Sequence, residues 1–266
     1  MRTVGKALTI LDLFTEQRPS LTLTEIARAT GIDTATCHRM LKVLERHGYV
    51  FRQAATKHYS LGATVLRLAR TREITTPMSA TLQAVVDALT EKVSETSHAS
   101  VIAGQQVATV AAREGTRSNR VHVEYGARME LHATATGLAC LAYADAAFVE
   151  HALAAQMTRF TATTVSNAKA LEEALSLTRS RGYSVADCSF DADVVGVGAP
   201  FFNADGIAMG AVAVATPANR MNAPNLARTA LEVMAAGIEA TRRLGGIPPQ
   251  DFLDLYRLMA ARDDAA

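Results

Sequence analysis

The segment TLTEIARATGIDTATCHRMLKVLERHG, residues 22–48, decides the fold of the N-terminal part of the chain. Thr22 and Glu25 have the spacing of a capping box, in which a hydroxyl and a carboxylate accept hydrogen bonds from free backbone N–H groups. The short helix that follows ends at Gly31, and Asp33 is a favourable cap for a second, longer helix. Two helices joined by so short a turn predict a helix-turn-helix.

The second helix of this pair has one apolar and one polar face. Four side chains at helical spacing predict a buried stripe: Cys37, Met40, Leu41 and Leu44. The opposite face is short-chained and polar at the helix start and basic further along, as in helices that read base edges and neutralise phosphates in the major groove. With a threonine of the first helix, the candidate DNA-contacting residues are Thr24, Thr34, Ala35, Thr36, His38, Arg39 and Lys42.

The flanking sequence extends this module on both sides. Apolar residues at helical spacing predict a helix over 3–16, ahead of the pair. Residues 49–53 and 57–61 predict the two strands of a wing, whose turn contains no glycine. On this wing we expect three side chains to face the sugar–phosphate backbone: Arg52, Lys57 and His58.

The charge is divided between the two ends of the chain. Residues 1–76 hold 12 Lys/Arg and 6 Asp/Glu, a net of +6, whereas the remainder holds 15 and 20, a net of −5. A basic module joined to an acidic one favours double-stranded DNA as the partner of the first. The alternatives are chance drift between two solvated surfaces and a basic face that binds protein.

Composition excludes several classes of protein. Apolar residues make up 49% of the chain and charged residues 20%, which is typical of globular domains. No apolar run approaches the ~18 residues of a membrane span, and the N-terminus lacks the apolar core of a signal peptide. Three widely spaced cysteines and no Cys/His pair at metal-finger spacing predict no disulfide, metal or cofactor. These features predict a cytoplasmic protein.

The second half of the chain alternates between helical and strand-like patterns. Helical spacing predicts a linker helix over 63–77 and further helices over 82–93, 134–144, 145–156, 167–181 and 225–244. Strands are predicted over 98–103, 107–112 and 121–125, and a hairpin over 194–202 and 207–215 turns at Asn203-Ala204-Asp205-Gly206. This order predicts an α+β domain, with helices packed against a sheet.

Several of these segments resemble the IclR family of bacterial transcriptional regulators. The similar segments are 3–14, 23–27, 31–41 and 59–62 in the first half, and 126–137, 181–184, 199–206 and the strand 207–215 in the second. The resemblance implies a winged helix-turn-helix over 1–62, a linker helix over 63–77, a GAF-like effector-binding domain over 78–245 and a tail helix over 246–266. Asp33 and Ala35 stand where the family usually has serine, so contacts of those serines are not carried over.

The resemblance also implies a small-molecule effector and a homodimer, commonly a dimer of dimers. In the family the effector lies between the sheet, a turn at a helix start and a nearby loop, where helix-terminal amides suit a carboxylate. The corresponding residues here are Ala135, Thr136, Gly137, Asp187, Cys188 and Ser189, with His132 as a further head-group partner. Alternation on the terminal hairpin places Gly196, Gly198, Met209, Ala211, Ala213 and Ala215 on one face. These small side chains either leave room for a ligand or let a helix approach closely.

Departures from the family at the effector site favour one kind of ligand. Cys188 and Ser189 replace a frequent acidic pair, Leu138 replaces a lysine, and Ala213 and Ala215 replace hydroxyl side chains. A molecule with an apolar or aromatic body and one polar head fits these residues better than a very small polar acid. Cys188 as a redox switch is the weaker interpretation, because most lone cysteines are packing residues.

Two other functions are alternatives to effector-controlled DNA binding. A hydrolase or zinc enzyme would carry a Gly-x-Ser-x-Gly, a phosphate-binding glycine loop or a His-Glu-x-x-His, and the sequence has none, so no catalytic residues are predicted. The second alternative is a DNA-binding protein with an unliganded structural second domain. Beyond residue 249, an apolar stripe at 252, 255, 256 and 259 predicts a tail helix that a partner or second subunit covers.

Overall fold

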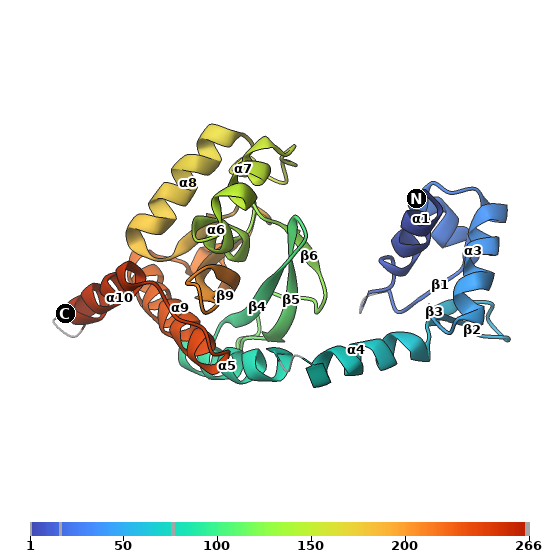
Figure 1. Cartoon of the computed structure of the whole chain (residues 1–266), viewed down its shortest axis with the longest axis horizontal. Helices are drawn as coiled ribbons and strands as arrows, with labels where there is room; N and C mark the ends of the chain where they lie inside the picture. Colours follow the sequence, from blue (N-terminus) through green and yellow to red (C-terminus); the bar gives the residue numbers. More distant parts are fainter. Residues whose placement is uncertain (1, 16–17, 76–77, 264–266) are drawn as a thin grey trace. The chain divides into compact units, whose positions relative to one another are not determined.

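The computed structural model describes residues 2–15, 18–75 and 78–263, which divide into two compact units, Met1–Pro77 and Met78–Ala266 (Figure 1). Each unit has its own hydrophobic core. Within the described residues no helix is long and apolar enough to cross a membrane.

The first unit is the predicted winged helix-turn-helix. Its elements are α1 (Arg2–Leu11), β1 (Ser20–Leu21), α2 (Leu23–Thr30), α3 (Thr34–Arg46), β2 (Val50–Arg52), β3 (Tyr59–Leu61) and α4 (Ala63–Thr75). The three strands form an antiparallel sheet in the order β1-β3-β2, so the wing has one short strand more than the sequence predicted. Helix α1 ends at Leu11, earlier than expected, and Glu16 lies outside the described residues.

Local hydrogen bonds set the boundaries of the helix pair. The Thr22 N–H donates to Glu25 Oε2 at 2.7 Å and the Glu25 N–H donates to Thr22 Oγ1 at 3.3 Å, which is the predicted capping box. The Thr22 N–H and the Thr22 hydroxyl both donate to the Glu25 carboxylate, and these bonds lower the pKa of Glu25. Gly31 ends α2 with a φ of 65°, a left-handed conformation that glycine adopts without steric cost.

Helix α4 corresponds to the expected linker helix. It begins at Ala63 and is described as far as Thr75. Thr76 and Pro77, which were expected to end this helix, lie outside the described residues.

The second unit is built on a six-stranded antiparallel sheet in the order β6-β5-β4-β9-β8-β7. Its elements are α5 (Met78–Val93), β4 (Thr96–Ala103), β5 (Gln106–Arg113), β6 (Arg128–Glu130), α6 (Ala135–Ala142), α7 (Ala146–Ala154), α8 (Ala168–Arg181), β7 (Ser184–Asp187), β8 (Val194–Phe202), β9 (Ala208–Pro217), a 3-10 turn η1 (Ala218–Arg220), α9 (Ala223–Arg243) and α10 (Gln250–Asp263). Helices α5 and α9 pack on one face of the sheet, and α6 packs on the other with α8 behind it (Figure 1). The α+β prediction is therefore confirmed.

The strand predicted over 121–125 was wrong. The edge strand beside β5 is β6, where Met129 pairs with Val107. Side chains hold the 121–125 segment instead: Thr96 Oγ1 donates to the Val121 carbonyl at 2.6 Å, and the Tyr125 hydroxyl donates to Gln83 Oε1 at 2.6 Å. A segment bound through side chains has no backbone ladder to join, so it does not form a strand.

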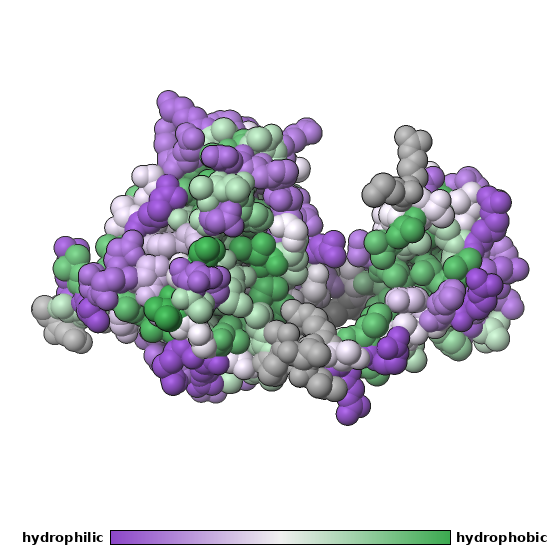
Figure 2. All heavy atoms as spheres, viewed as in Figure 1, coloured by the Kyte–Doolittle hydropathy of each residue, from purple (hydrophilic) through white to green (hydrophobic). Residues whose placement is uncertain are grey.

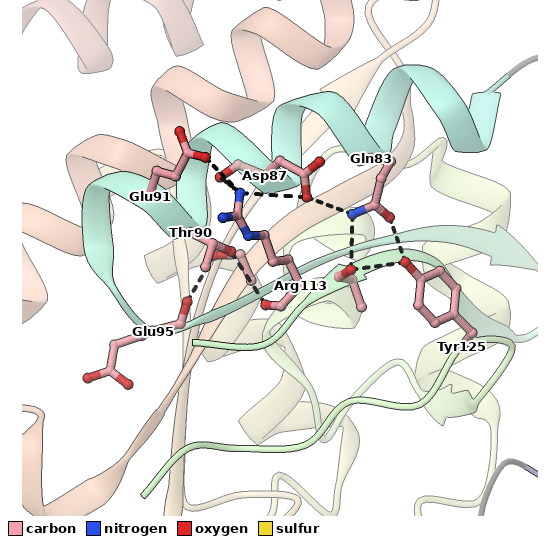
Figure 3. A network of polar contacts seen from close by, with 9 residues as sticks. Gln83, Asp87, Thr90, Glu91, Glu95, Arg113 and Tyr125 are labelled. Atoms are coloured by element: carbon pink, nitrogen blue, oxygen red, sulfur yellow. Dashed lines mark hydrogen bonds and ion pairs between the residues drawn. The ribbon is translucent and has the colours of Figure 1, made fainter. Parts of the chain in front are cut away.

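The Tyr125 contact belongs to a polar network between α5 and β5 (Figure 3). Gln83 Nε2 donates to Asp87 Oδ1 at 2.8 Å and to the Ala112 carbonyl at 3.0 Å. Arg113 Nη1 donates to the Asp87 carbonyl at 3.1 Å and to Glu91 Oε1 at 2.9 Å. This network fastens α5 to the sheet along three of its turns.

The register of the terminal hairpin differs from strict alternation at one point. Phe201 pairs with Gly210 but Phe202 pairs with Ala208, so the register shifts between them. Met209 consequently packs into the core on the α5–α9 face, opposite to the face that alternation predicted.

The apolar stripe of the tail helix α10 packs against its own unit, but three of its four residues are half-buried, so a covering partner stays a prediction. Phe252 is fully buried and makes edge-to-face contacts with Tyr143 and Phe202, with ring centroids 5.6 and 5.2 Å apart. The other stripe residues, Leu255, Tyr256 and Met259, pack against the same core. The apolar stripe is therefore an intramolecular packing surface.

Candidate nucleic-acid interface and small-molecule site

Helix α3 buries the predicted stripe and presents its other face to solvent. Cys37, Met40, Leu41 and Leu44 lie in the core of the first unit. On the opposite face Thr34, Ala35, Arg39 and Lys42 are exposed and Thr36 and His38 are half-buried. Figure 2 shows hydrophilic side chains along the outer edge of this unit, over α3. The candidate base-contacting residues are thus accessible on one continuous surface.

The start of α3 is fixed by its cap. Asp33 Oδ1 accepts a hydrogen bond from the Thr36 N–H at 2.9 Å, and this bond lowers the pKa of the Asp33 carboxyl. Arg39 Nη2 donates to Thr36 Oγ1 at 3.1 Å, one turn further along. The Arg39 guanidinium is therefore held near the N-terminal turns, the part of a recognition helix that reaches base edges.

The wing carries its three basic candidates differently. Lys57 is exposed at the tip, where a φ of 61° turns the chain after residues 54–56. His58 is half-buried, and its Nδ1 lies 3.1 Å from the Thr56 carbonyl. The Arg52 guanidinium lies over the Tyr59 ring, 5.5 Å from its centroid, which leaves it less free than Lys57. Thr24 is exposed on α2.

In the second unit, the start of α6 packs directly on the small residues of the terminal hairpin. Ala135 forms a buried cluster with Ala186 and Ala213. A Cβ added to Gly196 would lie 3.0 Å from the Ala135 Cβ, and one added to Gly198 would lie 3.1 Å from the Ala135 carbonyl. Of the two interpretations of these small side chains, close approach of a helix is the one that this geometry displays.

A buried histidine lies on the same face of the sheet. His98 on β4 is paired with Ala213 on β9, and directly opposed residues point to the same side. Burial lowers the pKa of His98 to about 4, so the imidazole is neutral at physiological pH. Among the described residues, neither His98 Nδ1 nor the buried Thr136 Oγ1 on α6 has a hydrogen-bond partner.

His98 was not among the site residues predicted from the sequence. Thr96, His98 and Ser100 alternate along β4 and pair with Ala215, Ala213 and Ala211. Three polar residues spaced by two along a strand were the signal that would have found them, although Ser97 interrupts the alternation at the start of the strand.

The predicted loop residues form a separate set of contacts. Three threonine hydroxyls donate to successive carbonyls of this loop: Thr163 to Asp187 at 2.9 Å, Thr161 to Cys188 at 2.7 Å and Thr164 to Ser189 at 2.6 Å. Burial is the main cause that raises the pKa of the Cys188 thiol. A thiol with a raised pKa yields little thiolate, which argues against the redox switch.

The remaining candidates lie to either side of the alanine cluster. His132 lines a cavity of about 280 Å³ with Gln106, Glu130 and Met157, and its Nε2 lies 2.8 Å from the Thr158 carbonyl. Gly137 is pressed against the Leu131 backbone, so its lack of a side chain serves packing. Ala215 is buried opposite Gly196. The structure thus brings Ala135, Gly196 and Ala213 into contact. His132 and the 187–189 loop instead form hydrogen bonds with residues 158–164.

Comparison with known proteins finds matches to both units. Residues 73–240 match the family described as bacterial transcriptional regulator IclR C-terminal, and residues 3–54 match the IclR helix-turn-helix domain. The chain is 28% identical to the HTH-type transcriptional regulator XynR of Escherichia coli (strain K12), over 92% of this chain and 98% of that protein.

Two solved structures are similar over nearly the whole chain. An IclR transcriptional regulator from Silicibacter sp. TM1040 is 34% identical with a TM-score of 0.79, covering 94% of this chain and 99% of that one. An IclR homolog from Microbacterium hydrocarbonoxydans, solved in complex with 4-hydroxybenzoate, has the same fold at 19% identity, with a TM-score of 0.75 and coverage of 91% and 99%.

Proposed function

Because this chain belongs to the IclR family of bacterial transcriptional regulators, we propose that α3 reads operator DNA and that an effector bound on the α6 face of the second unit modulates this reading. The protein is a DNA-binding transcriptional regulator whose C-terminal domain takes a small-molecule ligand. The observation that carries the DNA-binding role is the accessible polar face of α3, backed by a fully buried stripe.

The effector is a small organic acid with an apolar or aromatic body. Gly196, Gly198 and Ala213 form a surface of small residues on the sheet, which suits a flat apolar group. The first turn of α6 supplies amide groups and the unpaired Thr136 hydroxyl, which suit a carboxylate head. One family member of the same fold is complexed with 4-hydroxybenzoate, a molecule of this kind.

Effector binding at this face requires α6 to move. Ala135 already lies against Gly196 and Gly198, so a ligand enters only by lifting the start of α6 away from the sheet. Closely packed interfaces switch between discrete arrangements, which makes such a displacement a suitable trigger. Asp187 ends β7, and Cys188 and Ser189 follow it directly. Ala186 of this strand clusters with Ala135, so the loop would move with the start of α6.

We further propose that the protein acts as a homodimer, assembled into a dimer of dimers, in the cytoplasm. Two copies of α3 then face two half-sites of a palindromic operator, since operator symmetry mirrors protein symmetry. No catalytic role is proposed for either unit, because the relatives are transcriptional regulators.

The test uses the full-length protein and an operator fragment selected from random DNA. Fluorescence anisotropy measures operator affinity with and without a panel of aromatic and aliphatic carboxylates, beginning with 4-hydroxybenzoate. A carboxylate that changes operator affinity must bind the DNA complex and the free protein with affinities that differ by the same factor. Sequence-independent DNA binding, or an operator affinity that no carboxylate changes, would contradict the proposal.

A further inference from the structure

A further cavity lies in the second unit, away from the face of the sheet that α6 covers. It has a volume of about 270 Å³ and lies where the end of β9, η1 and the start of α9 meet the loop that carries Arg117. Thr216 lines it, next in sequence to Ala215 but on the opposite side of β9, since successive strand residues alternate. None of its lining residues belongs to the effector candidates described above.

The charges around this cavity are unbalanced. Three of its lining side chains are arginines (Arg117, Arg220 and Arg228) and one is a glutamate (Glu95), a net of 3 − 1 = +2. Arg220 neutralises the Glu95 carboxylate through two hydrogen bonds, from Nε to Oε1 at 2.8 Å and from Nη2 to Oε2 at 2.7 Å. Arg117 makes only a longer contact with Glu95, at 3.4 Å.

Arg228 is exposed on α9 and has no ion-pair partner among the described residues. The Glu95–Arg220 ion pair carries no net charge, and Glu95 is buried, with 7% of its surface exposed. Arg117 and Arg228 are left as two cations whose charges are not balanced within the cavity. An arginine guanidinium binds a carboxylate through two parallel hydrogen bonds, so each of these side chains can hold one carboxylate group.

Two further features point to an acceptor in the cavity. The Thr216 side chain is 3% exposed, and its hydroxyl finds no hydrogen-bond partner within the described ranges. A buried hydroxyl without a partner is unfavourable, and a bound oxygen atom would satisfy it. The 21-residue helix α9 also begins here with its Asn222 cap, so its positive end adds to the potential for an anion.

From these observations we propose that the cavity at the start of α9 binds a small dianionic organic acid, a dicarboxylate held by Arg117 and Arg228 with one oxygen on Thr216. Its volume of about 270 Å³ lies just below the range for ligand pockets, about 300–1,000 Å³, so the ligand is small. The site is a second ligand site, separate from the effector face under α6.

The experiment measures ligand binding to the full-length protein by calorimetry and by the rise in melting temperature, at constant ionic strength. The probes are the dicarboxylates succinate, glutarate and adipate, with inorganic phosphate and neutral succinamide as comparisons. Thr216→Val keeps the shape of the side chain and removes its unpaired hydroxyl, so the variant folds. Arg228→Gln removes one cation, and Arg257→Gln on α10 is the matched control outside the cavity.

We expect saturable binding of at least one dicarboxylate to the wild type, the Arg257→Gln control and an Ala213→Leu variant of the α6 face. Thr216→Val and Arg228→Gln should each weaken that binding, Arg228→Gln by about tenfold or more. Equal dicarboxylate affinity in all variants, or no binding of any of the three dicarboxylates, would overturn the proposal. Stabilisation by phosphate without dicarboxylate binding would overturn the organic-acid assignment, and binding lost only in Ala213→Leu would assign the ligand to the α6 face.

Discussion

His98 on β4 and Ala213 on β9 are directly opposed across the sheet, so a buried imidazole and a small methyl group share the face that α6 covers. This pairing connects a buried titratable group of the second unit with the predicted wall of the effector site. A ligand seated between α6 and the sheet would meet both residues. The two positions therefore allow separate tests of ligand binding and of protonation.

Ala213→Leu should abolish the response to the effector while DNA binding without effector survives. Ala213 is fully buried against Ala135 and Ala186, so a leucine occupies the space that a ligand would need. Overpacking of this kind typically costs about 1–3 kcal/mol of stability. Ala215→Leu should act in the same direction, since Ala215 lies on the same face. Calorimetry measures effector affinity, and anisotropy measures operator affinity.

Ala199→Leu is the matched control for this substitution. Ala199 is equally buried on β8, but it packs into the core on the α5–α9 face. A leucine there should lower stability by a similar amount and leave effector affinity unchanged. If both variants bind effector like the wild type, the alanine face serves helix packing alone.

Acidification should destabilise the second unit through His98. Burial lowers the pKa of His98 from 6.5 to about 4, so between these values the unfolded chain takes up a proton that the folded chain excludes. Above pH 6.5 the imidazole is neutral in both states, so His98 adds no pH dependence to the free energy of unfolding. As the pH falls below 6.5, the free energy of unfolding decreases. Between pH 7 and pH 5 the loss is roughly 2 kcal/mol.

Urea unfolding at pH 7 and pH 5 measures this loss. His98→Gln should remove most of the pH dependence, because glutamine does not titrate. His151→Gln, at an exposed histidine on α7, should keep it. An identical pH dependence in wild type and His98→Gln would rule out the histidine as its source.

Arg39→Ala should weaken operator binding by on the order of 1–3 kcal/mol and relax the preference at one base position. The reason is the placement of Arg39 near the capped start of α3, held by Thr36 Oγ1 at 3.1 Å. Anisotropy with a set of single-base operator variants measures the preference. An operator preference unchanged in Arg39→Ala would mean that α3 is not the recognition helix.

Lys57→Ala should instead weaken binding to all sequences by a similar factor. Lys57 lies at the tip of the wing, where it would neutralise a phosphate and release a counterion. The slope of log affinity against log salt should fall by about one. Loss of discrimination between operators in this variant would assign Lys57 to base reading.

Phe252→Ala should destabilise the second unit by about 3–5 kcal/mol, because the ring is fully buried between Tyr143 and Phe202. Leu258→Ala on the same helix should change stability by less than about 0.5 kcal/mol, since Leu258 is half-exposed. Chemical denaturation measures both. Similar stabilities in the two variants would contradict the intramolecular role of α10.

Features controlled by neighbouring residues could be predicted from the sequence. The capping box of Thr22 and Glu25, the Asp33 cap and the buried stripe of α3 depend on contacts within a few residues. The terminal hairpin was likewise fixed by its Asn203–Gly206 turn, and its strands lie as expected apart from a shift at one end.

Features that depend on distant partners could not be predicted. The strand β1 consists of two residues whose pairing with β3 gives no periodic signal. Met209 changed faces because of a register shift, and residues 121–125 are held by Thr96 and Gln83 from other elements. The same holds for the tail, since its apolar stripe does not reveal whether the covering surface belongs to the same chain. In the candidate site, the hairpin face was predictable, but the contact of Ala135 with Gly196 needed the structure.

The pairing of β4 with β9 determines the order in which the two units are completed during synthesis. Thr96 pairs with Ala215, a residue 215 − 96 = 119 positions further along the chain, so the central strands of the second sheet cannot meet until most of the protein has left the ribosome. The pairings of the winged unit, Val50 with Leu61 and Ser20 with Ser60, lie much closer together along the chain, so this unit can complete early. We therefore expect the first unit of a nascent chain to fold before the second unit is complete. Premature termination of synthesis would then release a DNA-binding unit that lacks the effector-binding domain.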